Sequence, residues 1–129
     1  MLWSAGQSNL PFANQSHVGA AKSGVDNSIA NLALEWGRCG IRSNSVVPGA
    51  IRDTEGMRRL AEPVGADICN PAVALGRFGH AEEVAAMAVV LSSPLASYAT
   101  GARVVVDGGL SGPRAISHAL AVADGTEKG

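Results

Sequence analysis

Two segments rich in β-branched residues, 41–47 and 103–106, are separated by stretches with helical periodicity, and this order limits the folds open to the chain. Parallel strands joined by a helical crossover form a βαβ unit, whose strands need cover on both faces and neighbours at their edges. Because two strands are too few for an independent sheet, we expect the chain either to dimerise or to form part of a larger domain.

A long helix is predicted from Ser16 onward, over about twenty residues, because apolar residues recur there every three or four positions. The residues of this apolar stripe are Val18, Ala21, Val25, Ile29, Leu32 and Trp36. Gly37 and Gly40 are expected to end the helix. Residues 1–15, which are rich in Gly, Asn and Gln, are expected to form a loop.

A second helix is predicted over residues 81–92, with two glutamates in its first turn, where the helix dipole favours anions. Its predicted buried face consists of Val84, Met87, Ala88 and Leu91. A short helix, capped by Asp53 or Thr54, is expected to extend to Leu60. Segment 103–106 is expected to be a fully buried strand. We expect one partial domain over residues 1–111 and a weakly structured tail over 112–129.

The composition excludes several classes of function. With 10 Lys and Arg against 11 Asp and Glu, the net charge of -1 gives no general attraction to nucleic acid or to an anionic membrane. No apolar run approaches the roughly 20 residues of a membrane span, and the first residues lack the features of a signal peptide. Cys39 and Cys69 lie far apart with no metal-ligand spacing, so we predict reduced thiols and no metal site.

Lys22 and Asp26 stand one helical turn apart at the flank of the apolar stripe. Such a pair is commonly a solvated salt bridge that stabilises a helix only slightly. A partly buried lysine would differ, because a fixed ammonium can hold ribose hydroxyls and stabilise negative charge that develops in a reaction. The spacing alone leaves both interpretations open.

The segment from Pro48 to Thr54 follows the first β-branched strand, at the edge where open α/β sheets bind ligands. Its Pro-Gly turn would expose backbone N–H and C=O groups there, although an ordinary strand-to-helix turn has the same composition. Arg58 and Arg59 follow, and they are either a solvated pair or a site for a phosphate-bearing ligand.

In this order, the segments resemble the C-terminal half of the short-chain dehydrogenase/reductase family. The resemblance covers residues 16–109. It is carried by Ala20-Ala21-Lys22, Ala33-Leu34-Glu35-Trp36-Gly37, Gly40-Ile41-Arg42-Ser43-Asn44, Pro48-Gly49-Ala50-Ile51, Gly76-Arg77-Phe78-Gly79, Ser97-Tyr98-Ala99-Thr100-Gly101 and Val106-Asp107-Gly108-Gly109. It implies an α/β fold, namely the C-terminal half of a Rossmann-like doubly wound parallel sheet that is incomplete in this chain.

One departure from the family is informative, because the family's usual catalytic tyrosine stands four residues before the lysine, where this chain has Val18. With this departure, and in segments 17–22 and 54–60 and at Asp26, the chain is similar to the peroxisomal-type 2,4-dienoyl-CoA reductases, which also lack that tyrosine. The resemblance implies NADPH-dependent reduction of a 2,4-dienoyl-CoA to a 3-enoyl-CoA in the oxidation of unsaturated fatty acids.

The resemblance also implies roles for particular residues. Lys22 would hold the nicotinamide ribose, Asp26 would assist proton delivery through water, and Arg59 would contact the acyl-CoA substrate. The positions expected to bind the cofactor are Lys22, Pro48, Gly49, Ala50, Ile51 and Thr54. The complete protein would be a homo-oligomer.

The family's Gly-rich phosphate loop and the residue that selects NADP over NAD would precede Met1, so we expect this chain to be a fragment that binds NADPH poorly on its own. Two alternatives remain. One is a carbonyl or 3-oxoacyl reductase of the same family, which would be expected to have a tyrosine at the position of Val18. The other is an inactive association module. We expect a peroxisomal or cytoplasmic location, although the chain does not end in a Ser-Lys-Leu-like tripeptide.

Overall fold

The computed structural model describes residues 2–4, 15–55, 57 and 73–112. The chain divides into two compact units, each described here by itself. Unit 1 consists of residues 1–48 and 82–106, and unit 2 of residues 49–81 and 107–129. The predicted tail beyond residue 112, and the predicted short helix beyond Met57, lie outside the described residues.

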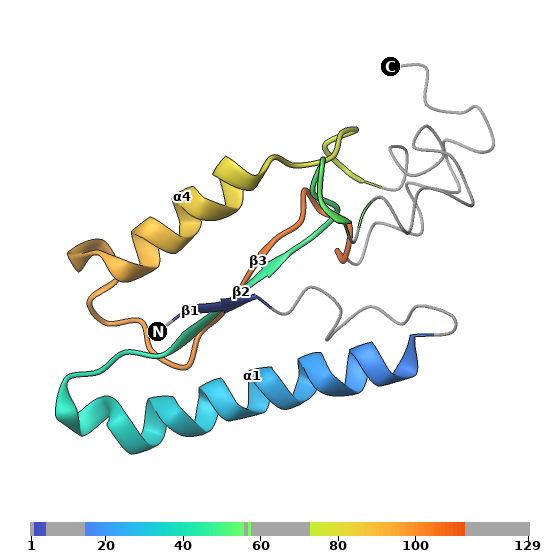
Figure 1. Cartoon of the computed structure of the whole chain (residues 1–129). Helices are drawn as coiled ribbons and strands as arrows, with labels where there is room; N and C mark the ends of the chain where they lie inside the picture. Colours follow the sequence, from blue (N-terminus) through green and yellow to red (C-terminus); the bar gives the residue numbers. More distant parts are fainter. Residues whose placement is uncertain (1, 5–14, 56, 58–72, 113–129) are drawn as a thin grey trace. The chain divides into compact units, whose positions relative to one another are not determined.

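A parallel three-stranded sheet, in the order β1-β2-β3, forms the centre of unit 1 (Figure 1). The strands are β1 (Leu2–Ser4), β2 (Asn44–Pro48) and β3 (Arg103–Val106). Ser45 of the central strand lies in register with Trp3 of β1 and with Arg103 of β3. Helices α1 (Ser16–Trp36) and α4 (Ala81–Ser92) lie on opposite sides of the strands, as in a doubly wound sheet (Figure 1). The predicted α/β fold is confirmed.

Helix α1 confirms the long helix that the apolar spacing predicts, but its buried face is shorter than the predicted stripe. Its fully buried side chains are Ile29 and Ala33, both in the second half of the helix. Trp36, the last residue of the predicted stripe, is 37% exposed. In the first half of α1, by contrast, Val18 and Val25 are half-buried and Ala21 is exposed.

The end of α1 differs from the expectation at one glycine. Gly37 keeps a right-handed conformation and starts the 3-10 turn η1 (Gly37–Cys39). Gly40, at a φ of 75°, is the residue that turns the chain away, because a left-handed conformation strains any residue with a side chain.

Three expectations about the strands are wrong. Residues 2–4 form a strand rather than a loop. Strand β2 begins at Asn44 and not at Ile41, which is 45% exposed. Strand β3 is not fully buried, since Val105 is 41% exposed. The physical reason is that β3 is an edge strand of the sheet in the described part of the chain, with β2 on one side only.

Helix α4 agrees with its prediction in bounds and in its face. Its first turn carries Glu82 and Glu83, and Leu91 is its buried residue. Among the other residues of α4, only Val84, Met87 and Ala88 are half-buried, and all three belong to the predicted face.

Polar side chains hold the start of β2 to the loop that precedes β3. The Arg42 guanidinium donates to the carbonyl oxygens of Ala99 (3.1 Å) and Ser93 (3.3 Å). The Asn44 side chain donates to Ala99 O and accepts from the Ala102 N–H, both at 3.0 Å. These bonds explain why a polar residue such as Asn44, 2% exposed, stands buried in the central strand.

In unit 2, the chain that follows β2 pairs with a later loop. Gly79 bridges Ile51 in a parallel arrangement, with its N–H on Ala50 O and its carbonyl oxygen on the Arg52 N–H, both at 2.9 Å. Among the described residues of this unit, Val73 and Phe78 are the buried apolar ones, at 2% and 5% exposure.

Asp107 organises the turn after β3. Its carboxylate accepts the Gly109 N–H at 2.8 Å and the Ser111 N–H at 2.7 Å, and it also accepts the Ser111 hydroxyl. Burial raises the pKa of Asp107, but the hydrogen bonds from Ser111 and Gly109 outweigh it and hold the pKa below the ordinary value of 3.8. The folded state therefore favours the charged carboxylate.

Asp107→Asn is expected to lower the free energy of unfolding at pH 7 by about 2 kcal/mol, because hydrogen bonds to a charged acceptor are lost. Since the folded pKa is depressed, the stabilisation by Asp107 is complete above the unfolded pKa and is lost as the pH falls through the folded pKa. The unfolding free energies of the two proteins, measured by denaturant titration, should thus begin to converge as the pH falls below 3.8, the ordinary pKa, and should approach each other further at lower pH. Asp53→Asn, at an exposed position, is the control. A difference that stays constant down to pH 2 would contradict this role.

Candidate active site

The connection between β1 and β2 sets the direction of α1. Because α1 links two parallel strands, it runs antiparallel to them, and its first turns lie toward the carboxyl ends of those strands. Open α/β sheets bind ligands at that edge. Lys22 stands in the second turn of α1 and is half-buried. The structure thus places Lys22 toward the edge of the sheet where a ligand is expected.

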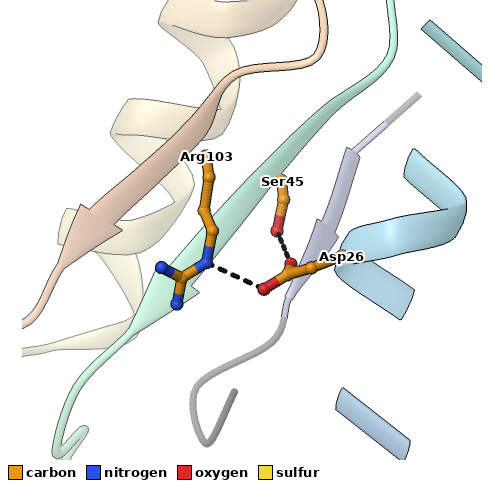
Figure 2. A network of polar contacts seen from close by, with 3 residues as sticks. All are labelled: Asp26, Ser45 and Arg103. Atoms are coloured by element: carbon orange, nitrogen blue, oxygen red, sulfur yellow. Dashed lines mark hydrogen bonds and ion pairs between the residues drawn. The ribbon is translucent and has the colours of Figure 1, made fainter. Parts of the chain in front are cut away.

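Asp26 lies one turn further along α1 and reaches the sheet (Figure 2). Its Oδ1 accepts the Ser45 hydroxyl at 2.8 Å, and its Oδ2 accepts Arg103 Nε–H at 2.8 Å. The side chains of Arg103 and Asp26 are 28% and 17% exposed, so the ion pair is largely removed from water. Both carboxylate oxygens therefore accept a hydrogen bond from a side chain of the sheet. We call Asp26, Ser45 and Arg103 the helix–sheet network.

The helix–sheet network was not predicted as a unit. The sequence singles out Asp26 but neither Ser45 nor Arg103. The one available signal is the composition of the strands, since Arg103 opens an apolar run and Ser45 lies within β2. A charged or hydroxyl-bearing residue on a covered face of a sheet needs a partner, and α1 covers β2.

The remaining predicted cofactor positions start at the last residue of β2 and continue into the chain that follows it. Pro48 ends β2 in unit 1, whereas Gly49, Ala50, Ile51 and Thr54 belong to unit 2. The structure thus brings Lys22, Asp26 and Pro48 into one unit and the others into the second unit. Arg58 and Arg59 lie outside the described residues.

Two of these positions have a structural role that the coordinates explain. A Cβ on Gly49 would stand 2.5 Å from Asp107 Cβ and 2.6 Å from Asp107 Cα, so only glycine fits against the turn after β3. Thr54 Oγ1 accepts the Met57 N–H at 3.2 Å, which confirms Thr54 as a capping residue. The other predicted cap, Asp53, has a φ of 60°.

A hollow of about 670 Å³ opens at the other end of the sheet from this edge, at the start of β2. Its lining includes Ile41, Arg42, Ser93 and Tyr98, and none of the predicted site residues. The Arg42 guanidinium is already bonded to loop carbonyls, so we do not place the active site there.

In the described part of the chain, no helix has the length and apolar character needed to cross a membrane. No group of three or more His, Cys, Asp or Glu side chains there could hold a metal ion.

Comparison with protein families and curated proteins shows which proteins the chain is similar to. A family model described as enoyl-(acyl carrier protein) reductase matches residues 2–111. A peroxisomal 2,4-dienoyl-CoA reductase of Saccharomyces cerevisiae, named as (3E)-enoyl-CoA-producing, is 48% identical over 101 residues, covering 78% of this chain and 34% of the yeast protein. The equivalent protein of Pongo abelii is 48% identical over 103 residues, covering 78% and 35%. The chain thus spans about a third of the length of these relatives.

Solved structures give the same fold. An oxidoreductase of the short-chain dehydrogenase/reductase family from Burkholderia thailandensis has a TM-score of 0.77 and 30% identity, covering 94% of this chain and 48% of that one. A gluconate 5-dehydrogenase from Burkholderia cenocepacia, solved in complex with NADP and tartrate, has a TM-score of 0.76 and 26% identity, covering 85% and 44%.

Proposed function

Because the chain belongs to the short-chain dehydrogenase/reductase family, we propose that it forms the C-terminal part of an NADPH-dependent 2,4-dienoyl-CoA reductase. The observation that carries this proposal is the half-buried Lys22 on α1, with Val18 in place of a tyrosine one turn earlier. The yeast and Pongo abelii relatives, which are named for this reaction, support it.

The name of the yeast relative states its product, a (3E)-enoyl-CoA, and this product defines the steps that an active site must catalyse. A 2,4-dienoyl-CoA that becomes a 3-enoyl-CoA gains one hydrogen at C5 and one at C2, while the remaining double bond moves between C3 and C4. The electrophilic end of the conjugated system is C5, so the hydride adds there and the electron pair moves toward the thioester oxygen. The resulting dienolate takes a proton at C2. The site must therefore stabilise an enolate and then supply a proton.

Lys22 fits a nicotinamide cofactor by its chemistry and its environment. Its ammonium carries three donors that match the oxygen acceptors of a ribose, and the residue is half-buried. When bound, NADPH would supply the hydride. Lys22 would hold the ribose and contribute positive charge near the dienolate. No tyrosine stands one turn before Lys22, so a phenol at that position takes no part in the proton transfer.

The other predicted roles remain proposals. Pro48, Gly49, Ala50, Ile51 and Thr54 would contact the cofactor, and Arg59 would bind the acyl-CoA. Asp26 is proposed to assist proton delivery through water, although both of its oxygens already accept a donor. We also propose that the complete protein is a homo-oligomer. A peroxisomal location is proposed for it as well, in line with the names of the relatives.

The test uses the complete open reading frame that contains this chain. Purified protein is given NADPH with either a 2,4-dienoyl-CoA or a 3-oxoacyl-CoA, and NADPH consumption is followed by absorbance. We expect turnover of the dienoyl-CoA with kcat/KM at least about 100-fold above that of the 3-oxoacyl-CoA, since the phenol that would protonate an alkoxide is missing. The reverse preference would favour the carbonyl reductase alternative. An oligomer that turns over neither substrate would favour the association module.

A further inference from the structure

We propose that Arg103 and Ser45 are positioning residues for Lys22. Through their bonds to Asp26 they fix the position of α1 along the strands, and this position determines where the Lys22 ammonium lies. The role of Lys22 in cofactor binding rests on the proposed function, whereas the helix–sheet network itself rests on the geometry alone.

The two donors of the network come from a rigid frame. Ser45 and Arg103 are register partners on the adjacent strands β2 and β3. Each bonds a different oxygen of the same carboxylate, at 2.8 Å in both cases. Because the ladder fixes the spacing of the two backbones, a carboxylate that accepts from both side chains is restricted in its position along the strands (Figure 2). The network therefore fixes the position of α1 along the strands.

Asp26 is the polar contact between α1 and the sheet that stands nearest to Lys22 among the bonds described here. The buried side chains of the helix, Ile29 and Ala33, both lie after Asp26. Lys22 lies before it, where Val18 and Val25 are only half-buried. Asp26 therefore meets the sheet one turn from the lysine, about 6 Å away along the helix axis.

The type of donor matters as well as the charge. Arg103 donates through Nε, which lies one bond nearer the backbone than the Nζ of a lysine and belongs to a planar guanidinium. A lysine at position 103 would keep the charge but would place a single, freely rotating ammonium further along the chain. We expect such a variant to hold α1 less exactly than arginine and better than an uncharged residue.

The experiment measures NADPH binding by nicotinamide fluorescence in the complete protein, with no acyl-CoA present. Arg103→Met is expected to raise the NADPH dissociation constant about tenfold, and Arg103→Lys about threefold, because the ammonium of Lys22 loses its fixed position. Ser45→Ala should have a smaller effect in the same direction. Arg38→Met, which removes an exposed arginine, and Ser28→Ala, which removes an exposed hydroxyl on α1, are the controls and should leave binding unchanged.

A double-mutant cycle separates positioning from a general loss of stability. Asp26→Arg combined with Arg103→Asp restores the opposite charges, so we expect it to bind NADPH more tightly than either single variant. The thermal midpoint of each variant is recorded beside its dissociation constant. Because the conservative and swapped variants keep the charges, they test the proposal even if Arg103→Met does not fold. Wild-type affinity in folded Arg103→Met, or no recovery in the swap, would overturn it.

One more variant, Asp26→Asn, distinguishes the positioning role of Asp26 from its role in proton delivery. If Asp26 holds α1 in place, Asp26→Asn raises the NADPH dissociation constant as Arg103→Met does. If it passes a proton, Asp26→Asn lowers kcat and leaves NADPH binding unchanged, which would overturn the positioning role. A wild-type protein that binds NADPH but does not reduce a dienoyl-CoA would contradict the proposed function only. A wild-type protein that binds no nicotinamide cofactor would overturn both.

Discussion

Lys22→Met is expected to lower kcat/KM for a 2,4-dienoyl-CoA by about 100- to 1,000-fold in the complete protein. The loss has two physical sources. One is the bond between the ammonium and the ribose, which orients the nicotinamide, and the other is the positive charge that stabilises the dienolate. Steady-state kinetics would show a lower kcat together with a higher KM for NADPH.

The controls for Lys22 separate charge from geometry. Lys22→Arg keeps the positive charge but places a planar guanidinium where a compact ammonium stood, so we expect it to recover only part of the activity. Arg38→Met removes a positive charge from an exposed site and is expected to leave kcat/KM unchanged. Near-normal kcat/KM in folded Lys22→Met would show that the half-buried lysine is a structural residue.

Gly49→Ala is expected to lower the free energy of unfolding by about 3 kcal/mol, because the chain cannot hold a Cβ at this position. The added methyl group would overlap Asp107 at 2.5 Å, and the second atom it meets, Asp107 Cα at 2.6 Å, is backbone that cannot move aside cheaply. The change would also disturb the carboxylate that closes the turn after β3. Denaturant unfolding of the complete protein measures the loss.

Gly24→Ala is the matched control for Gly49→Ala. Gly24 is an exposed position in the middle of α1, and a Cβ there would meet nothing within 4 Å. Alanine is favoured over glycine inside a helix by roughly 0.5–1 kcal/mol, so this variant is expected to be more stable. If both alanine variants shifted stability equally, the tight contact between Gly49 and Asp107 would not exist in solution.

The helices could be predicted from sequence because their signal is local. Apolar residues three or four apart gave α1 and α4, and the partly covered face of α4 is the predicted one. The strands were harder to predict. Strand β1 has only three residues, too few for a recognisable alternation, and the exposure of Val105 depends on the neighbours of β3 rather than on its own sequence.

The candidate site shows the same limit. Lys22 and Asp26 were found because they lie one turn apart on one helix. Arg103 lies 77 residues from Asp26 in the sequence, and nothing near either residue indicates that they meet. The burial that distinguishes a fixed lysine from a solvated one also depends on the tertiary fold. The identity of Gly49 has a comparable cause, since its neighbour Asp107 comes from a distant turn.

The central proposal is that the chain belongs to a 2,4-dienoyl-CoA reductase whose site contains Lys22 and no tyrosine one turn before it. The identity of the reaction product tests this proposal most directly. The complete protein is incubated with a 2,4-dienoyl-CoA and NADPH deuterated at the transferable position, and the product is analysed by NMR and mass spectrometry. We predict a 3-enoyl-CoA with one deuterium at C5 and a solvent-derived hydrogen at C2. Unchanged dienoyl-CoA, alongside deuterated 3-hydroxyacyl-CoA from a 3-oxoacyl-CoA in a parallel reaction, would contradict the claim.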